Sequence, residues 1–477
     1  MRLHSLERRS LRLCKDLIAR YKKNVNAGKG RLLKDAVELA SNPTLHRERS
    51  LQRFRRRFEE SSTGDGNHPL LLDHIPRLDQ SSLHQFQQNH LVANVPCLIE
   101  DARPYFDPVV SLWTDADGGD IRREWFHDAI PHDAWLSVTK SDDTEIGLKL
   151  QDWFSYLDGN LPQHQQPSML YLKDWHFLHW MYENTDRPEF GHSNPLYQVP
   201  PHFEDDILNN FHMVQSGDMS DYRFVYWGPA GSTTQPHTDV LHSCSWSYNV
   251  SGTKEWVIHV PLDDHSSNAA PSLITIKQQA GQIIFIPSGW QHSVVNLEET
   301  LSVNHNWATA AHVDCIWNCV REDLHKLQLN EPSSRRPTVE HEEWGLRQSN
   351  GLSVNVFFFM VLLRGWEVLL AGLGTESTPA YDWNQSFELH MLKNALTVLL
   401  DDESIRLHER LDAFLATDED AFSDHDKENM QNGQELATII SAARALVSVI
   451  EHLPVEEESI DFTFSHLRDK QQPKPVR

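Results

Sequence analysis

Residues 222–239 read YRFVYWGPAGSTTQPHTD, and this stretch decides the fold. Its first six residues are almost all apolar or aromatic, which is typical of a β-strand. The Gly228-Pro229-Ala230-Gly231 segment then predicts a tight turn. A second extended segment leads to His237 and Asp239. Because residues i and i+2 of a strand point to the same face, these two side chains can present a nitrogen and an oxygen to one metal ion.

A second motif supplies a third ligand. Residues 281–292 read GQIIFIPSGWQH, which predicts a buried strand over 283–286, a stop at Pro287-Ser288-Gly289 and a new strand from His292. Two histidines and one carboxylate on one side of a metal leave the opposite positions open, as in the facial triad of non-haem Fe(II) oxygenases. The chain has 28 His, so one His-x-Asp pair is expected by chance, whereas the ordered set of motifs is specific.

An oxygenase of this kind also needs a cation for the distal carboxylate of 2-oxoglutarate. Lys254, in Gly252-Thr253-Lys254-Glu255-Trp256, follows His237 by 17 residues and falls on the next predicted strand. A hydroxyl beside the ammonium group would share the same carboxylate, and Thr234 is the candidate. The sequence therefore predicts Fe(II) and 2-oxoglutarate as cofactor and co-substrate, with O₂ as the oxidant and ascorbate as the reductant.

The predicted secondary structure changes along the chain. Many short strands with Gly and Pro turns between about 165 and 310 suggest an antiparallel sandwich or barrel, and the pattern is helical from Asn306 to about Leu453. We divide the chain into five segments: a basic helical extension over 1–60, a linker over 61–74, a catalytic core over 75–310, a helical region over 311–455 and a tail over 456–477.

Charge limits the classes of partner. The net charge is −25, which disfavours general nucleic-acid binding. Residues 1–60 carry 17 Lys and Arg against 7 Asp and Glu, a net +10, so the remainder carries −35. This basic extension could contact RNA, an acidic partner or the body of the protein, and we interpret it as a solvated helical extension.

Other features bear on the compartment. Five scattered cysteines without a CxxC motif fit a reducing compartment. The apolar run 354–363 is about half the ~20 residues of a membrane span and predicts a buried helix. With no apolar signal segment at its start, we expect a cytoplasmic protein without membrane contact, with nuclear access through the basic run 53–57. Nothing in the sequence indicates the oligomeric state.

On these motifs, the chain resembles the JmjC family of oxygenases over roughly residues 75–310. The resemblance is carried by the metal and lysine motifs above together with three further stretches: Tyr171-Leu172-Lys173-Asp174-Trp175-His176, Ser245-Trp246-Ser247-Tyr248-Asn249-Val250 and Ser302-Val303-Asn304-His305-Asn306-Trp307. It implies an α+β protein with a double-stranded β-helix, the cupin or jelly-roll core, and helical N- and C-terminal extensions.

The resemblance also implies roles for particular residues. The metal triad falls on His237, Asp239 and His292, and the 2-oxoglutarate pocket on Lys254 and Thr234. In this family a tyrosine and a polar side chain often complete that pocket. We expect Tyr171 and Asn304 to do so here. The three further stretches resemble family members that hydroxylate a lysine of a translation release factor, which makes that protein the expected substrate.

Three other functions share these motifs. An N-methyl-lysine demethylase uses the same iron chemistry, but the chain shows no zinc finger or chromatin-reading motif. An RNA or tRNA hydroxylase would use the basic extension, against the charge of the acidic body. A non-enzymatic scaffold would not need the intact triad.

Overall fold

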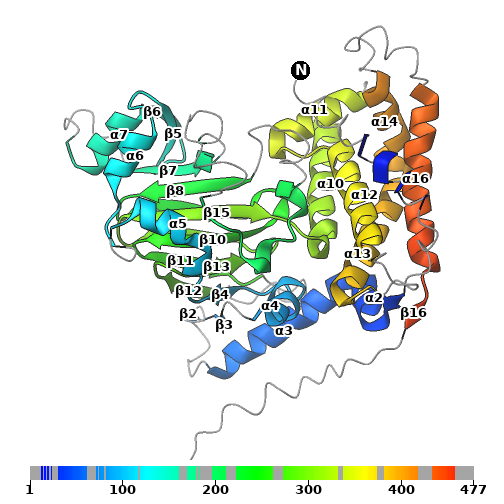
Figure 1. Ribbon diagram of the computed structural model, residues 1–477, viewed down its shortest axis with the longest axis horizontal. Coiled ribbons are helices and arrows are strands. Elements are labelled where there is room, and N and C mark those ends of the chain that lie inside the picture. Colours follow the sequence, from blue (N-terminus) through cyan, green and yellow to red (C-terminus); the bar gives the residue numbers. More distant parts are fainter. Residues whose placement is uncertain are drawn as a thin grey trace, which may run out of the picture.

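A computed structural model describes residues 31–61, 71–72, 75–79, 82–115, 119–160, 169–178, 196–210, 222–261, 272–330, 337–372, 381–416 and 432–456, with Met181 and scattered residues between 12 and 23. Most of the linker 61–74 and nearly all of the tail 456–477 lie outside the described residues. Figure 1 shows stacked β-sheets with a group of long helices standing beside them.

Two sheets form the catalytic core. The larger has, in spatial order, β3 (Arg77–Leu78), β4 (Cys97–Ile99), β13 (Ile283–Ile286), β10 (Cys244–Ser251), β15 (Thr300–Trp307), β8 (Arg223–Gly228), β7 (Leu170–Trp175), β5 (Trp135–Lys140) and β6 (Glu145–Lys149). The smaller has β2 (Leu71–Leu72), β12 (Leu273–Gln278), β11 (Lys254–His259), β14 (His292–Asn296) and β9 (Thr233–His237). From β8 to β11 and again from β12 to β15, every successive strand changes sheet. This is the expected double-stranded β-helix in an α+β protein.

Strand β15 explains why the barrel interior is polar at one end. Its alternate residues Leu301, Val303 and Trp307 belong to the apolar core outside the barrel. The intervening Ser302 and Asn304 face inward, where Ser302 meets Lys254. All eight residues of the strand are buried, because helices cover its outer face and the facing sheet covers its inner face. The alternation therefore builds a polar cavity wall on an apolar support.

Helices cover the outer face of the larger sheet. These are α4 (Leu83–Phe86), the π-helix η1 (Gln87–Leu91), α5 (Arg103–Trp113), α6 (Arg123–Ala129), α7 (Leu150–Leu157) and the short 3₁₀ helix η4 (Pro201–Phe203). Trp113 of α5 and Phe126 of α6 are fully buried, and Phe126 lies 4.8 Å from Trp227 of β8, ring centre to ring centre. Aromatic packing fixes the strand that leads into the metal motif.

The C-terminal helices form a second apolar body. They are α10 (Val313–Asn330), α11 (Val339–Asn350), α12 (Val354–Ala371), α13 (Trp383–Asp401), α14 (Leu407–Ala416) and α16 (Asn432–His452), with the 3₁₀ helices η6 (Ala310–His312) and η7 (Glu403–Ile405). Among the described residues α12 is the one helix long and apolar enough to cross a membrane, and 78% of it is buried. It packs against α10, α13, α14 and α16. The apolar run 354–363 is thus a core helix, as predicted.

The N-terminal segment packs against the rest of the protein. Strand β1 (Leu32–Leu33) pairs in parallel with β16 (Val455–Glu456), and α2 (Lys34–Ser41) packs on α13. Helix α3 (Pro43–Ser61) lies below the barrel and reaches toward the helical body in Figure 1. The prediction of a solvated extension is wrong for α3, because one face of this basic helix buries Ser50 and Phe54.

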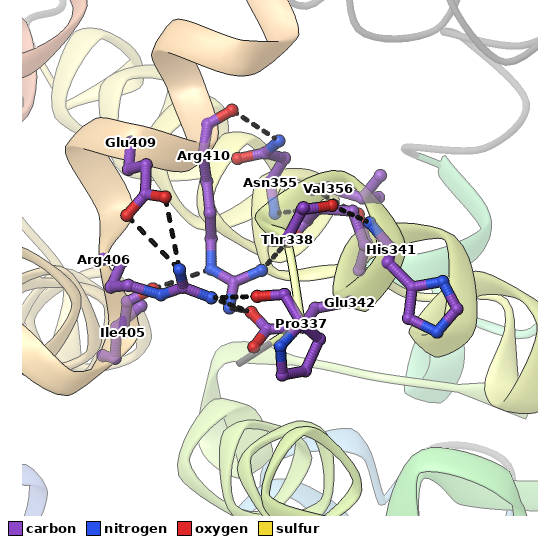
Figure 2. A network of polar contacts seen from close by, with 12 residues as sticks. Pro337, Thr338, His341, Glu342, Asn355, Val356, Ile405, Arg406, Glu409 and Arg410 are labelled. Atoms are coloured by element: carbon purple, nitrogen blue, oxygen red, sulfur yellow. Dashed lines mark hydrogen bonds and ion pairs between the residues drawn. The ribbon is translucent and has the colours of Figure 1, made fainter. Parts of the chain in front are cut away.

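Charged side chains join three helical elements inside the C-terminal body (Figure 2). Glu342 and Glu343 of α11 are buried, and so is Arg410 of α14. Arg410 donates to Glu342 and, over 2.7 Å, to Glu343, while Arg406 at the end of η7 donates to Glu342 over 2.7 Å. Each buried charge therefore has a partner of opposite sign, which offsets the cost of removing it from water.

Replacing Arg410 with methionine is expected to lower the free energy of unfolding by about 3–5 kcal/mol, because it leaves the buried Glu343 carboxylate without its cationic partner and takes one of two from Glu342. Urea unfolding would measure the loss. The control is Lys326→Met, which removes an exposed ion pair with Asp323 on α10 and should change stability little. Equal stability of the two variants would contradict the role assigned to the buried network.

Candidate active site

The structure brings the three predicted metal ligands together at one end of the barrel. His237 ends β9, Asp239 follows two residues later and His292 begins β14. One ligand atom from each lies within 4.8 Å of the others, and His237 Nε2 is 3.9 Å from Asp239 Oδ1. His237 and His292 are paired residues of neighbouring strands. Among the described residues this is the one group of three such side chains close enough to hold a metal.

Backbone carbonyls orient both imidazoles. His237 Nδ1 lies 2.9 Å from the carbonyl oxygen of Gln235, and His292 Nδ1 lies 3.1 Å from that of Trp290. A carbonyl can only accept, so each Nδ1 carries the proton and each Nε2 keeps its lone pair for a metal. Burial lowers the pKa of His292, which favours the neutral ligand form.

Asp239 is built to bind a cation. Its Oδ2 is buried and has no hydrogen-bond partner among the described residues. The prediction put both ligands on one strand. Strand β9 instead ends at His237, but Asp239 keeps an extended backbone (φ −57°, ψ 148°), so the two side chains still converge. An unpaired carboxylate oxygen beside two imidazoles fits a divalent ion such as Fe(II).

The turn after Asp239 is strained. Leu241 (φ 59°) and His242 (φ 48°) in η5 (Val240–His242) both adopt the left-handed conformation, which costs roughly 1–2 kcal/mol per non-glycine residue. Burial of Leu241 and a 2.6 Å hydrogen bond from Ser288 Oγ to the His242 carbonyl oppose this strain. Ser288 lies in the turn before His292, so one hydroxyl connects the two ligand-bearing loops.

Lys254 lies inside the barrel on β11. Its side chain is 1% exposed, its Nζ donates to Ser302 Oγ over 2.6 Å, and it lies 6.0 Å from the centre of the Tyr226 ring. Burial lowers the pKa of Lys254 from 10.5 to about 7. No carboxylate among the described residues pairs with this ammonium group, so the site offers a cation to an anionic ligand.

The three remaining predicted residues also line the inner face. Thr234 on β9 pairs with Val294 of β14 and is partly buried. Tyr171 on β7 is buried and hydrogen-bonds to Asn296, the residue that pairs with Lys254. Asn304 Nδ2 donates to Ser302 Oγ over 3.0 Å. The hydroxyl in contact with Lys254 is that of Ser302, and the role of Thr234 stays a prediction.

Sequence reasoning missed Ser302, Asn296 and Tyr226. Ser302 lies two residues before Asn304 on β15 and could have been found by strand alternation. Tyr226 on β8 is the register partner of Ser302 on the neighbouring strand β15, and its hydroxyl donates to Asp174 Oδ1 over 2.6 Å. Only the strand register places these side chains next to Lys254, and register depends on contacts distant in sequence.

We expect the affinity for 2-oxoglutarate to fall as pH rises above 7. The anion pairs with the charged form of Lys254, and the folded protein without ligand loses that proton with a pKa of about 7. The loss approaches about tenfold per pH unit. Stability without ligand changes in the opposite sense and rises between pH 7 and about 10.5, because the unfolded lysine still holds its proton.

Calorimetric titration of the Mn(II)-loaded protein between pH 6.5 and about 9 would measure this dependence. The control is Lys254→Arg, whose guanidinium stays charged and whose affinity should remain level. If the affinity of the wild-type protein for 2-oxoglutarate did not change with pH over this range, the assignment of Lys254 would be contradicted.

The sequence is similar to a known protein family and to several known proteins. A family model described as "JmjC domain, hydroxylase" matches residues 267–307, from β12 to the end of β15. The 2-oxoglutarate and iron-dependent oxygenase JMJD4 of Homo sapiens is 30% identical over 426 residues, which is 80% of this chain and 95% of that protein. JMJD4 of Danio rerio is 32% identical over 292 residues, 54% of this chain and 64% of that protein. The arginine-specific demethylase JMJ20 of Arabidopsis thaliana is 31% identical over 275 residues, 49% of this chain and 57% of that protein.

The matched lengths differ among these relatives. The chain spans slightly less than two thirds of the Danio rerio protein but nearly all of the Homo sapiens one. The family match includes His292, the third ligand of the metal site. Together with the double-stranded β-helix and the converging ligand triad, these similarities show that the chain belongs to the JmjC family of 2-oxoglutarate and iron-dependent oxygenases.

Proposed function

We propose that this protein is an Fe(II)- and 2-oxoglutarate-dependent dioxygenase that hydroxylates a lysine side chain of a translation release factor. The proposal of oxygenase activity rests on one observation: His237, Asp239 and His292 converge on the same barrel that holds the buried cation Lys254. When bound, Fe(II) couples the reduction of O₂ to the oxidation of 2-oxoglutarate to succinate and CO₂ and of a substrate C–H bond to C–OH.

The chain's own residues supply position and charge. The two Nε2 atoms and the Asp239 carboxylate would hold the metal from one side, which leaves the opposite side for the co-substrate and O₂. Lys254 and Ser302 would bind the distal carboxylate of 2-oxoglutarate through charge-assisted hydrogen bonds. Tyr171 and Asn296, whose side chains are hydrogen-bonded to each other, would hold the wall of this pocket in place. Because Lys254 is buried, its charge is little screened by bulk water and would act more strongly on a bound carboxylate.

The match along 95% of the Homo sapiens JMJD4 supports the oxygenase chemistry, and a lysine-bearing substrate is proposed from the resemblance of the sequence motifs to lysyl hydroxylases. In addition, residues outside the basic extension carry a net charge of −35, which attracts a cationic peptide over long range. The release factor is proposed from the resemblance alone.

Demethylation is the second candidate, and the name of the Arabidopsis thaliana relative favours it. The same reaction on an N-methyl carbon gives a hemiaminal, which collapses to formaldehyde and the demethylated amine. On a side-chain carbon away from nitrogen the product is a stable alcohol. The outcome depends on which carbon the site holds nearest the metal. An RNA or tRNA hydroxylase receives less support, because α3 of the basic extension packs against the protein itself.

A product assay distinguishes the two reactions. The enzyme is incubated with Fe(II), 2-oxoglutarate and ascorbate, together with release-factor peptides that carry unmodified lysine, N-methyl-lysine or N-methyl-arginine. We expect one added oxygen on unmodified lysine, equal amounts of succinate and no formaldehyde, with Asp239→Ala as the inactive control. Turnover of the methylated peptides alone, with release of formaldehyde, would replace the hydroxylase by a demethylase.

The compartment follows from the proposed substrate. Translation factors act in the cytoplasm, and we propose that this protein does so too, with nuclear access through the basic run 53–57. Cell fractionation tests this, and residence in a membrane or mitochondrial fraction would contradict it.

A further inference from the structure

The N-terminal helix α3 contacts the start of α10, which packs on the turn after Asp239, and it contacts Trp290 in the loop before His292. It contributes no metal ligand itself. It makes these contacts through Arg47 and Phe54, which lie about two turns apart on the helix. Figure 1 shows α3 passing beneath the joint between the barrel and the helical body. We propose that α3 is a positioning element for the metal site, and that Arg47 and Phe54 are its positioning residues. The proposal rests on the assignment of the metal site and not on the identity of the substrate.

The contact of Arg47 is specific. Its two terminal nitrogens donate to the Asp314 carboxylate over 2.8 and 2.7 Å, and Nη2 also donates to the Ala311 carbonyl over 2.6 Å. Nη1 lies 3.1 Å from Cys315 Sγ. The Arg47 side chain is 12% exposed. These groups lie around the start of α10, so Arg47 joins the N-terminal helix to this helix end by a planar, bidentate contact that lysine could not reproduce.

The start of α10 in turn supports the turn after Asp239. Helix α10 packs against η5, and His312 Nδ1 lies 3.4 Å from Cys244 Sγ, at the residue where β10 begins. The turn between Asp239 and Cys244 contains the two left-handed residues Leu241 and His242. A strained turn keeps its conformation only while its surroundings hold it. Arg47 therefore acts on Asp239 through α10 and η5.

Phe54 acts on the other ligand loop. Its ring meets Trp290 edge to face at 5.8 Å, and both are buried in the smaller apolar cluster on the barrel. The carbonyl of Trp290 accepts the Nδ1 proton of His292. A shift of Trp290 would therefore rotate the His292 ring and move Nε2. One rigid helix thus contacts the supports of Asp239 and His292 at the same time.

The proposal predicts linkage between metal binding and the docking of α3. If docked α3 favours the ligand geometry, a bound metal must favour docked α3 by the same free energy. Groups that orient metal ligands typically change affinity by about 10- to 100-fold when removed. A helix that only stabilised the fold would change the unfolding temperature without changing the affinity of the folded protein for metal.

The test measures Mn(II) affinity by electron paramagnetic resonance in the full-length protein, without substrate. We expect Arg47→Met to bind Mn(II) about 10- to 100-fold more weakly while its circular dichroism stays native. Two controls should stay within about twofold of wild type: Arg49→Met, an exposed arginine of the same helix, and Arg410→Met, which destabilises the distant helical body. Wild-type affinity in Arg47→Met, or equal weakening in Arg410→Met, would overturn the proposal.

A second measurement needs no variant of α3. Mn(II) should slow amide hydrogen exchange of residues 43–61 in the wild-type protein and leave it unchanged in Asp239→Ala, which lacks a ligand. If the wild-type protein binds Mn(II) but the hydrogen-exchange rate of α3 is the same with and without the ion, the proposal is overturned. This outcome holds even if Arg47→Met fails to fold. Both measurements stay decisive whether the substrate proves to be a lysine, a methylated side chain or neither.

Discussion

Asp239→Ala is expected to abolish turnover, to below about one thousandth of the wild-type rate, while the protein stays folded. The two histidines that remain cannot hold the metal in the required geometry. Asp239 supplies the one carboxylate of the ligand set, and its Oδ2 has no other partner among the described residues. Removing it therefore breaks no internal hydrogen bond of that oxygen.

The same change should not destabilise the metal-free protein. A buried carboxylate oxygen without a partner is costly, so the alanine variant should unfold at the same temperature as metal-free wild type or slightly above it. Mn(II) should raise the unfolding temperature of wild type and not of the variant, because only wild type binds the ion in its folded state. Succinate release and thermal unfolding with and without Mn(II) check both expectations. Turnover at the wild-type rate would contradict the ligand assignment.

The three residues that the structure brings together could be picked out from the sequence because they lie in short local motifs. His237 and Asp239 are two residues apart, and His292 follows the turn 287–289 closely and begins the next strand. Strands rich in β-branched and aromatic residues were also recognised, for example β13 with the bounds predicted, 283–286. In these cases one segment contains the whole signal.

Features that depend on distant contacts were not predicted. Trp135 to Lys149 form the hairpin β5–β6, which extends the larger sheet beyond β7 and lies outside the range of about 165–310 in which strands were predicted. The docking of α3 was also missed, because its charge pattern predicts a solvated helix. Its Arg47 pairs with Asp314, which lies 267 residues further along the chain. The hydroxyl beside Lys254 likewise comes from Ser302, 48 residues away.

Lys254→Met is the second change with a large expected effect, and it should act on 2-oxoglutarate alone. Methionine keeps most of the buried volume of lysine and removes the ammonium group. A charge-assisted hydrogen bond contributes roughly 1.5–3 kcal/mol, so the dissociation constant for 2-oxoglutarate should rise by about 10- to 150-fold. Mn(II) binding should be unchanged, because Lys254 is not among the metal ligands.

Stability should move in the opposite direction from affinity. At pH 7.5 the wild-type protein without ligand holds Lys254 in an environment that lowers its pKa to about 7, at a cost in folding free energy that methionine does not carry. Lys254→Met should therefore unfold at higher temperature than ligand-free wild type. Added 2-oxoglutarate should reverse the order, because it stabilises wild type more than the weaker-binding variant. Titration calorimetry and thermal unfolding of the Mn(II)-loaded proteins measure the two effects. Ser302→Ala removes the hydroxyl that accepts a hydrogen bond from Nζ and keeps the charge, so its loss of affinity should be smaller. A Lys254→Met protein that still bound 2-oxoglutarate as tightly as wild type would show that another cation holds the distal carboxylate.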